Sequence, residues 1–272
     1  MKLFSISGRQ FNYQNIENAL NFWQFYLHKF YDGGKIEAFF NSLKMRSPLY
    51  GGRPCNVEYS FSEHHVEQLN SKGIGVMLTL SNHYFTEDAY RQTIPILECV
   101  NHSLNSAAIV NDELARRIAE DFPAIHRKAS VIKLISSLDE IHRALDLYHS
   151  VVLHPKLNDD VELLQSIDCK NQIILFANTR CLYKCEHPIC YKSISKQMIT
   201  QGRWDKQVCN YKDNRQAVEG YTIFDLNQEQ FNGFTQFKLI PVPDKHLQLD
   251  YCQKSAITTS LMTTKTGMRI IR

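Results

Sequence analysis

Residues 76–122 read VMLTLSNHYFTEDAYRQTIPILECVNHSLNSAAIVNDELARRIAEDF and carry the pattern that decides the fold. The short apolar runs Val76–Ser81 and Ala107–Val110 predict strands. The longer amphipathic runs that follow them, Thr86–Val100 and Asp112–Asp121, predict helices. Alternation of this kind is typical of βα units arranged around a parallel sheet.

The same alternation extends to both sides of this stretch. Further strands are expected at Leu3–Ser7, Ile36–Phe40, Ser130–Ile135, Val151–His154, Gln172–Ala177 and Gln236–Ile240. Further helices are expected at Tyr13–Phe30, Glu63–Asn70, Leu138–Tyr148 and Asp159–Ile167, with Ser62 capping the second of these and Asp112 opening the helix that it begins.

Eight strands separated mostly by helices predict an α/β fold, a TIM-like (β/α)8 barrel, for which about 250 residues are typical. We expect a single domain over residues 1–272, with irregular N- and C-terminal additions and a cysteine-rich insertion at about 178–215. An open, doubly wound sheet is the alternative fold.

Composition excludes several classes of protein. The chain has 272 residues, 43% of them hydrophobic, and its 31 basic and 28 acidic side chains give a net charge of +3, which neither requires nor excludes nucleic acid. No run approaches the roughly 20 apolar residues of a membrane span, and we read no signal peptide. We therefore expect a cytoplasmic protein without a membrane partner, in which clustered cysteines bind metal or act in catalysis.

Polar residues recur where the predicted strands end. Asn82, Asn111 and Asn178 each close a strand, and the sixth strand leads through His154 and Lys156 to Asn158. In a barrel the carboxyl ends of the strands form the active-site face, so Asn82, Asn111, His154 and Asn178 are candidate catalytic residues, and Lys156 and Asn158 candidate binding residues. The alternative is that Asn is simply common at strand exits and helix caps.

The strongest chemical signal follows the seventh strand, in NTRCLYKCEHPICY. It places Cys181, Cys185, His187 and Cys190 within ten residues. Thiolates in such a cluster suit zinc or an iron–sulfur cluster. The C-x3-C-x4-C spacing is not the C-x2-C pair of a zinc knuckle, which favours iron. The fourth ligand is left open among the candidates Cys55, Cys209 and His187.

Two other segments suggest binding. Gly51 and Gly52 permit positive φ and close approach of the backbone, and Arg53 beside them is placed to hold an anionic group. After the cysteines, basic residues alternate with aromatic ones, which is typical either of nucleic-acid binding or of an ordinary solvated surface. These residues are Lys184, Lys192, Lys196, Arg203, Lys206 and Lys212, with Tyr183, Tyr191, Trp204 and Tyr211.

From about Gly51 to Tyr251 the sequence resembles the U32 collagenase-like peptidase family. The shared features are Cys55 after an early strand, a strand ending at Asn82, the cysteine stretch, a helix carrying Ser195, and a closing strand in GFTQFKL. The resemblance implies a barrel, often with a 4Fe-4S cluster, whose ligands here would be Cys181, Cys185, Cys190 and Cys55. Members are named peptidases, and several act in oxygen-independent hydroxylation of tRNA bases or of a quinone precursor.

Three functional hypotheses follow. The first is an iron–sulfur enzyme acting on an RNA base, a peptide or a small metabolite, with a possible partner protein. The second is a barrel binding protein stabilised by zinc, without catalysis. The third is a hydrolase that uses Cys181 as nucleophile with a base such as His154 or His187.

Overall fold

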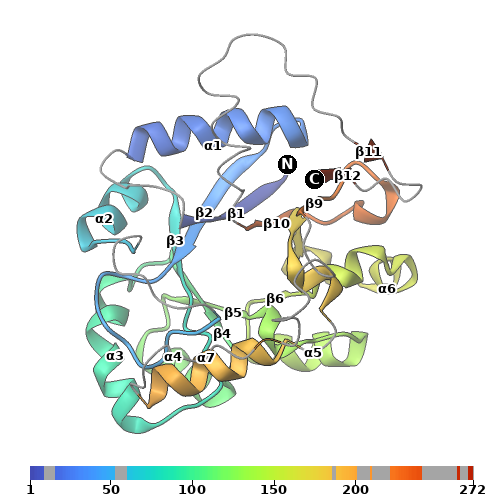
Figure 1. Ribbon diagram of the computed structural model, residues 1–272. Coiled ribbons are helices and arrows are strands. Elements are labelled where there is room, and N and C mark those ends of the chain that lie inside the picture. The colour runs from blue at the N-terminus through green and yellow to red at the C-terminus, as the bar shows by residue number, and fades with distance from the viewer. Residues whose placement is uncertain are drawn as a thin grey trace.

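The computed structural model describes residues 1–8, 16–52, 60–185, 188–200, 209, 221–240, 262–263 and 269–271 (Figure 1). The helices are α1 (Ile16–Tyr31), α2 (Glu63–Ser71), α3 (Glu87–Cys99), α4 (Asp112–Asp121), α5 (Leu138–Leu145), α6 (Val161–Ser166) and α7 (Ile189–Ile199). The strands are β1 (Leu3–Ser7), β2 (Lys35–Asn41), β3 (Gly75–Leu78), β4 (Ser106–Ile109), β5 (His126–Ala129), β6 (Ser150–Val152), β7 (Ile173–Phe176), β8 (Asn178–Thr179), β9 (Tyr221–Ile223), β10 (Gln236–Leu239), β11 (Met262–Thr263) and β12 (Arg269–Ile271). Within the described residues, no helix has both the length and the apolar character that crossing a membrane requires.

Eight parallel strands close into a barrel in the order β1-β10-β7-β6-β5-β4-β3-β2. The last of them, β10, closes the barrel by pairing with β7 on one side and β1 on the other. Helices α1 to α6 each lie in a connection between consecutive barrel strands, and Figure 1 shows α1, α2 and α3 outside the ring of strands. The predicted (β/α)8 barrel is therefore confirmed, and the open doubly wound sheet is wrong.

One predicted strand is wrong. The sequence analysis placed the fifth strand at Ser130–Ile135, but β5 lies just before it, at His126–Ala129. Ser130 instead caps a 3₁₀ turn at Val131–Lys133, with its side chain accepting from the Ile132 amide. The apolar run thus serves as a loop at the strand exit, while a polar sequence forms the strand.

The predicted start of α4 is also shifted by one residue. Asn111, and not Asp112, is its N-cap, because the Asn111 side-chain oxygen accepts from the amides of Glu113 and Leu114. Ser62 caps α2 as expected, in a capping box completed by His65.

Between β7 and β10 the chain leaves the barrel. It forms β8, a 3₁₀ turn at Cys181–Lys184, helix α7 and then β9, and β8 and β9 belong to a separate antiparallel sheet in the order β11-β12-β9-β8. The sequence analysis expected an insertion in this region but no second sheet. Very short strands carry too little periodic pattern to be recognised.

The barrel interior contains a buried ion pair. A register shift between Phe4 and Ser5 of β1 marks an irregularity opposite β2, next to Glu37. The Glu37 carboxylate accepts from the Ser5 hydroxyl at 2.9 Å and from Lys128 Nζ at 3.2 Å. Since β2 and β5 are not neighbours in the barrel, the pair reaches across the interior and neutralises the charge there.

We expect Glu37→Gln to destabilise the fold, because Lys128, only 5% exposed, would keep its charge without a carboxylate. Breaking such a pair costs about 3 kcal/mol of unfolding free energy, although partial exposure of Glu37 will reduce the loss. Urea denaturation provides the measurement. A second substitution, Lys128→Met, should recover much of the stability, and a double variant as weak as Glu37→Gln alone would contradict the role given to the charge.

Candidate functional site: a cationic cavity at the barrel mouth

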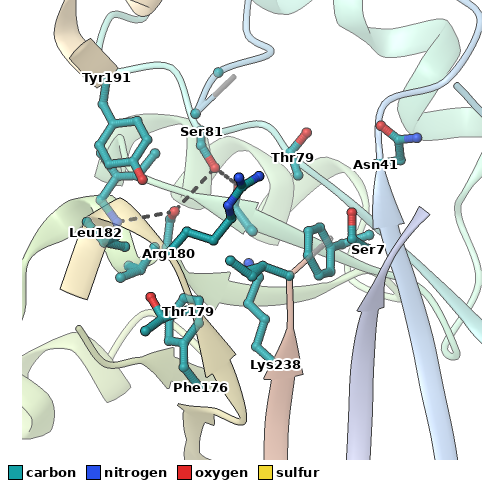
Figure 2. A pocket seen from close by; sticks show the side chains of 18 of the residues that line it. Ser7, Asn41, Thr79, Ser81, Phe176, Thr179, Arg180, Leu182, Tyr191 and Lys238 are labelled. Atoms are coloured by element: carbon teal, nitrogen blue, oxygen red, sulfur yellow. Dashed lines mark hydrogen bonds between the residues drawn. The ribbon is translucent and has the colours of Figure 1, made fainter. Parts of the chain in front are cut away.

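A cavity opens at the carboxyl ends of the barrel strands, where barrel enzymes place their active sites (Figure 2). It contains about 940 Å³ of empty space, a figure that includes its opening to solvent. Much of its wall is apolar, from Phe40, Ile132, Phe176, Leu182 and Ile240. Apolar walls with a few placed polar groups are the usual form of a small-molecule site.

Two cationic side chains line this cavity. Lys238 comes from β10, is 7% exposed, and its Nζ lies 4.3 Å from the centroid of the Phe40 ring. Arg180 follows β8 and is exposed at the mouth. Figure 2 shows both near the middle of the cavity, with Ser81 on one side and Thr179 and Phe176 on the other. Among the described lining residues there is no Asp or Glu, so the wall carries net positive charge.

Hydroxyl groups form one rim of the cavity. The Ser81 hydroxyl, after β3, donates to the Ala108 carbonyl of β4 at 2.9 Å and lies 3.3 Å from the Ser130 hydroxyl after β5. The three neighbouring strand ends are thereby tied together. The dashed lines of Figure 2 mark hydrogen bonds at this rim.

Thr179 contributes a hydroxyl of a different kind. It ends β8, lines the cavity and is 1% exposed. Its Oγ1 atom has no hydrogen-bond partner among the described residues. Buried hydroxyls are nearly always paired, so this one needs an explanation such as a bound water or ligand.

The Gly51-Gly52 pair lies against the same rim, as part of the cavity wall. A Cβ atom on Gly51 would lie 2.3 Å from the Ser81 carbonyl oxygen, and Gly52 has φ +78°. The close approach expected from the sequence is therefore to the end of β3. Arg53 and Cys55, which follow, lie outside the described residues, so their predicted binding and metal-ligand roles stay predictions.

The asparagines at the strand exits hold the loops of the mouth together. Asn82 donates to the Pro48 and Ser195 carbonyls at 2.8 and 3.0 Å, which joins the loop after β2 and helix α7 to the end of β3. Asn158 donates to the Phe176 carbonyl at 2.7 Å. Asn178 accepts from the Ile240 amide at 2.7 Å, extending the pairing beyond β10, and its amide contacts the Tyr221 hydroxyl.

None of Asn82, Asn111, Asn158 and Asn178 is among the residues that line the cavity. Asn111 caps α4 and also donates to the His83 carbonyl at 3.1 Å. The polar side chains expected to ring the mouth do gather there, but their contacts are with backbone. A catalytic role for them stays a prediction that the cavity does not support.

His154 and Lys156 likewise lie outside the cavity lining. His154 caps a 3₁₀ turn at Pro155–Asp159, and its Nδ1 atom accepts from the Lys156 amide at 3.2 Å. Burial, with the nearby Lys156 charge, lowers the pKa of His154 to about 4. Lys156 itself is exposed.

The three clustered cysteines follow one another along the mouth. Cys181 is exposed, begins the 3₁₀ turn after β8 and lines the cavity. Cys185 ends that turn and is buried, and Cys190 lies half-buried in the first turn of α7. His187 lies outside the described residues, and Cys209 is half-buried. The thiols are therefore beside the cavity, with Cys181 in its wall.

One group of His, Cys, Asp and Glu ligand atoms within the described chain lies close enough for a single metal ion. It consists of His142, Asp168 and Cys169, all within 4.8 Å of one another, and the trio Cys181, Cys185 and Cys190 is not such a group. His142 is in the last turn of α5 and Asp168 precedes β7. This surface group is therefore at the amino-terminal end of the barrel, away from the cavity.

The predicted nucleic-acid segment is described only in part. Lys184, Lys192 and Lys196 are exposed, while Tyr191 lines the cavity. Arg203, Trp204, Lys206, Tyr211 and Lys212 lie outside the described residues.

Comparison with known proteins agrees at the level of fold. The solved structure of the U32 peptidase Mk0906 superposes with a TM-score of 0.59, covering 89% of this chain and 93% of the other. The two sequences are 10% identical, so the likeness shows a shared U32-like barrel and nothing finer. No protein-family model matches the sequence, and no curated protein matches it.

The sequence analysis missed the residues that give the cavity its character. Lys238 lies within the predicted strand Gln236–Ile240, and a single Lys in an apolar strand was a detectable signal for an inward-facing charge. Arg180 and Thr179 were quoted only as part of the cysteine stretch. Ser81 and Ser130 carried no signal, because Ser is common at strand ends.

We expect the depressed pKa of His154 to make stability fall with pH. The unfolded chain, with an ordinary histidine pKa near 6.5, takes up the proton first. The contribution is therefore full above about pH 6.5 and is lost as the pH falls toward 4. His154→Asn keeps a capping acceptor, so its unfolding temperature should fall less between pH 7 and 5. The exposed His64→Asn is the control, and an equal decline in all three proteins would contradict the role of His154.

Proposed function

We propose that this protein is an iron–sulfur enzyme with a U32-like barrel, and that it modifies a small molecule bound in the cavity at the barrel mouth. One observation carries the proposal: Cys181 belongs both to the cysteine cluster and to the cavity wall. A redox centre held by this segment would thus lie next to a substrate in the cavity.

The donor set fits an iron–sulfur cluster in kind. Cys181, Cys185 and Cys190 supply three thiols from one short segment, and Cys55 is the proposed fourth ligand. A single zinc ion binds thiolates at about 2.3 Å, which would bring their sulfur atoms within about 4.6 Å. The described trio is not gathered within 4.8 Å, which favours a larger, multi-iron group. Such a cluster supplies one-electron redox chemistry when bound.

The chain's own residues have separate tasks. The apolar wall of Phe40, Phe176 and Ile132 excludes water from the body of the substrate. Arg180 and Lys238 attract and orient a substrate with complementary charge. Hydrogen bonds of Asn82 and Asn178 hold the loops that carry these groups, so the cavity is largely formed before binding.

The reaction we favour is hydroxylation without oxygen, or another modification, of a small metabolite, with an RNA base as the larger alternative substrate. Peptide hydrolysis is a second candidate, because the solved relative in fold, Mk0906, is named a peptidase. A hydrolase using Cys181 with His154 has less support, since His154 is not in the cavity wall and its Nδ1 caps a turn.

Metal analysis on protein purified without oxygen tests the proposal. We expect about four irons and four sulfides per chain and a brown colour, as for a 4Fe-4S cluster. The double variant Cys181→Ala, Cys185→Ala should lose both. Cys99→Ala is the control, because Cys99 packs against the core on α3 and should leave the iron content unchanged.

A colourless protein without iron would overturn the proposal. One zinc per chain, lost in the double variant, would establish the zinc-stabilised alternative instead. Loss of iron in the Cys99→Ala control would show that iron retention reports only on folding.

A further inference from the structure

The barrel interior holds two buried lysines in different environments. Lys128 is matched by a carboxylate, Glu37, at 3.2 Å. Lys238 lines the cavity, and no carboxylate occurs among the described residues of the cavity wall. A buried cation is costly to remove from water unless a negative charge accompanies it. The charge missing from the wall can be supplied by a ligand.

A second cation stands at the mouth above the first. Arg180 is exposed to solvent and lines the same cavity as Lys238. Figure 2 shows the two side chains close to the same central space. An exposed guanidinium at the entrance and a buried ammonium inside are suited to attract an anion and then to hold it.

A third, independent observation concerns Thr179. Its buried hydroxyl lines the cavity and has no hydrogen-bond partner among the described residues. Leaving such a group unpaired costs free energy, so a ligand acceptor or donor at this point would be stabilising. The remaining wall is apolar, which suits the body of an organic molecule better than a bare inorganic ion.

We propose that the cavity binds a small organic anion, in which a carboxylate or phosphate group lies near Lys238 and Arg180 and an apolar body packs against Phe40 and Phe176. The Thr179 hydroxyl bonds to this ligand. The inference rests on the proposed function only in taking the cavity as the substrate site, and it narrows the substrate from RNA, peptide or metabolite to a small acid.

Isothermal titration calorimetry with matched probes tests this inference. The probes are 3-phenylpropionate, its neutral isostere 3-phenylpropionamide, and phenyl phosphate, which separates the two acidic groups. We expect at least one anion to bind the wild-type protein about tenfold or more tightly than the amide, the usual value of a charge-assisted contact. Equal binding of acid and amide, or no binding of either anion at millimolar concentrations, would overturn the inference.

Variants then assign the residues. Lys238→Gln should lower affinity for the anion to that of the amide. Lys170→Gln is the matched control, because Lys170 also lies over an aromatic ring, Phe234, at 5.1 Å but outside the cavity wall. Unchanged anion binding in Lys238→Gln would contradict the proposal. Lys238→Arg, which keeps the charge, guards against a loss caused by misfolding and should retain the preference for the acid.

Thr179→Val separates a binding role from a structural one. Because the hydroxyl has no protein partner, its removal should leave the unfolding temperature equal or higher while weakening the anion. A drop in stability with no change in binding would contradict the role of Thr179.

Iron content measured on the same variants keeps the two proposals apart. Loss of the preference for anions in wild-type protein that retains iron would strike this inference alone, whereas anion binding by iron-free protein would strike the redox proposal alone. Binding of single-stranded RNA that is equal in Lys238→Gln and wild type, with no binding of the anions, would assign the substrate to the exposed lysines of α7 and overturn the inference.

Discussion

Closure of the barrel by β10 is the interaction on which the rest of the structure depends. This strand pairs with β1, the first strand of the chain, and with β7, so the ring forms only when the chain returns after β8, α7 and β9. Asn178 secures that return, because its side chain bonds to the backbone of Ile240 just beyond β10. The same pairing carries Lys238 into the interior. Fold and cavity charge therefore have a common origin in one short strand.

The barrel interior treats its two lysines unequally. Lys128 is neutralised by Glu37 across the interior, with Ser5 completing the network. Lys238, one strand position from the mouth, faces a wall of hydroxyl and apolar groups. Stability alone would favour an apolar residue at this position, since burying a charge is costly. Retaining the lysine is more readily explained by a ligand than by folding.

Seven of the eight barrel strands and six helices follow from the sequence, since each is an apolar or amphipathic run of adequate length. The fifth strand was misplaced because its sequence, HRKA, is polar, while the apolar residues after it form a capped 3₁₀ turn. Local hydrophobicity cannot reveal that Lys128 is matched across the barrel by a residue 91 positions away. The strand-end asparagines were correctly seen as a group, but whether an amide faces a cavity or a carbonyl depends on loops that periodicity does not describe.

Similarity to Mk0906 at 10% identity has a clear physical meaning. Parallel strands of fixed spacing and tilt close into the same ring with many different side chains, so backbone shape persists where residue roles need not. The shared fold explains why a cavity lies at the carboxyl ends of the strands. It does not explain why Arg180 and Lys238 make this cavity cationic or why Thr179 has an unpaired hydroxyl. Those features belong to this sequence, and any account of its substrate must begin from them.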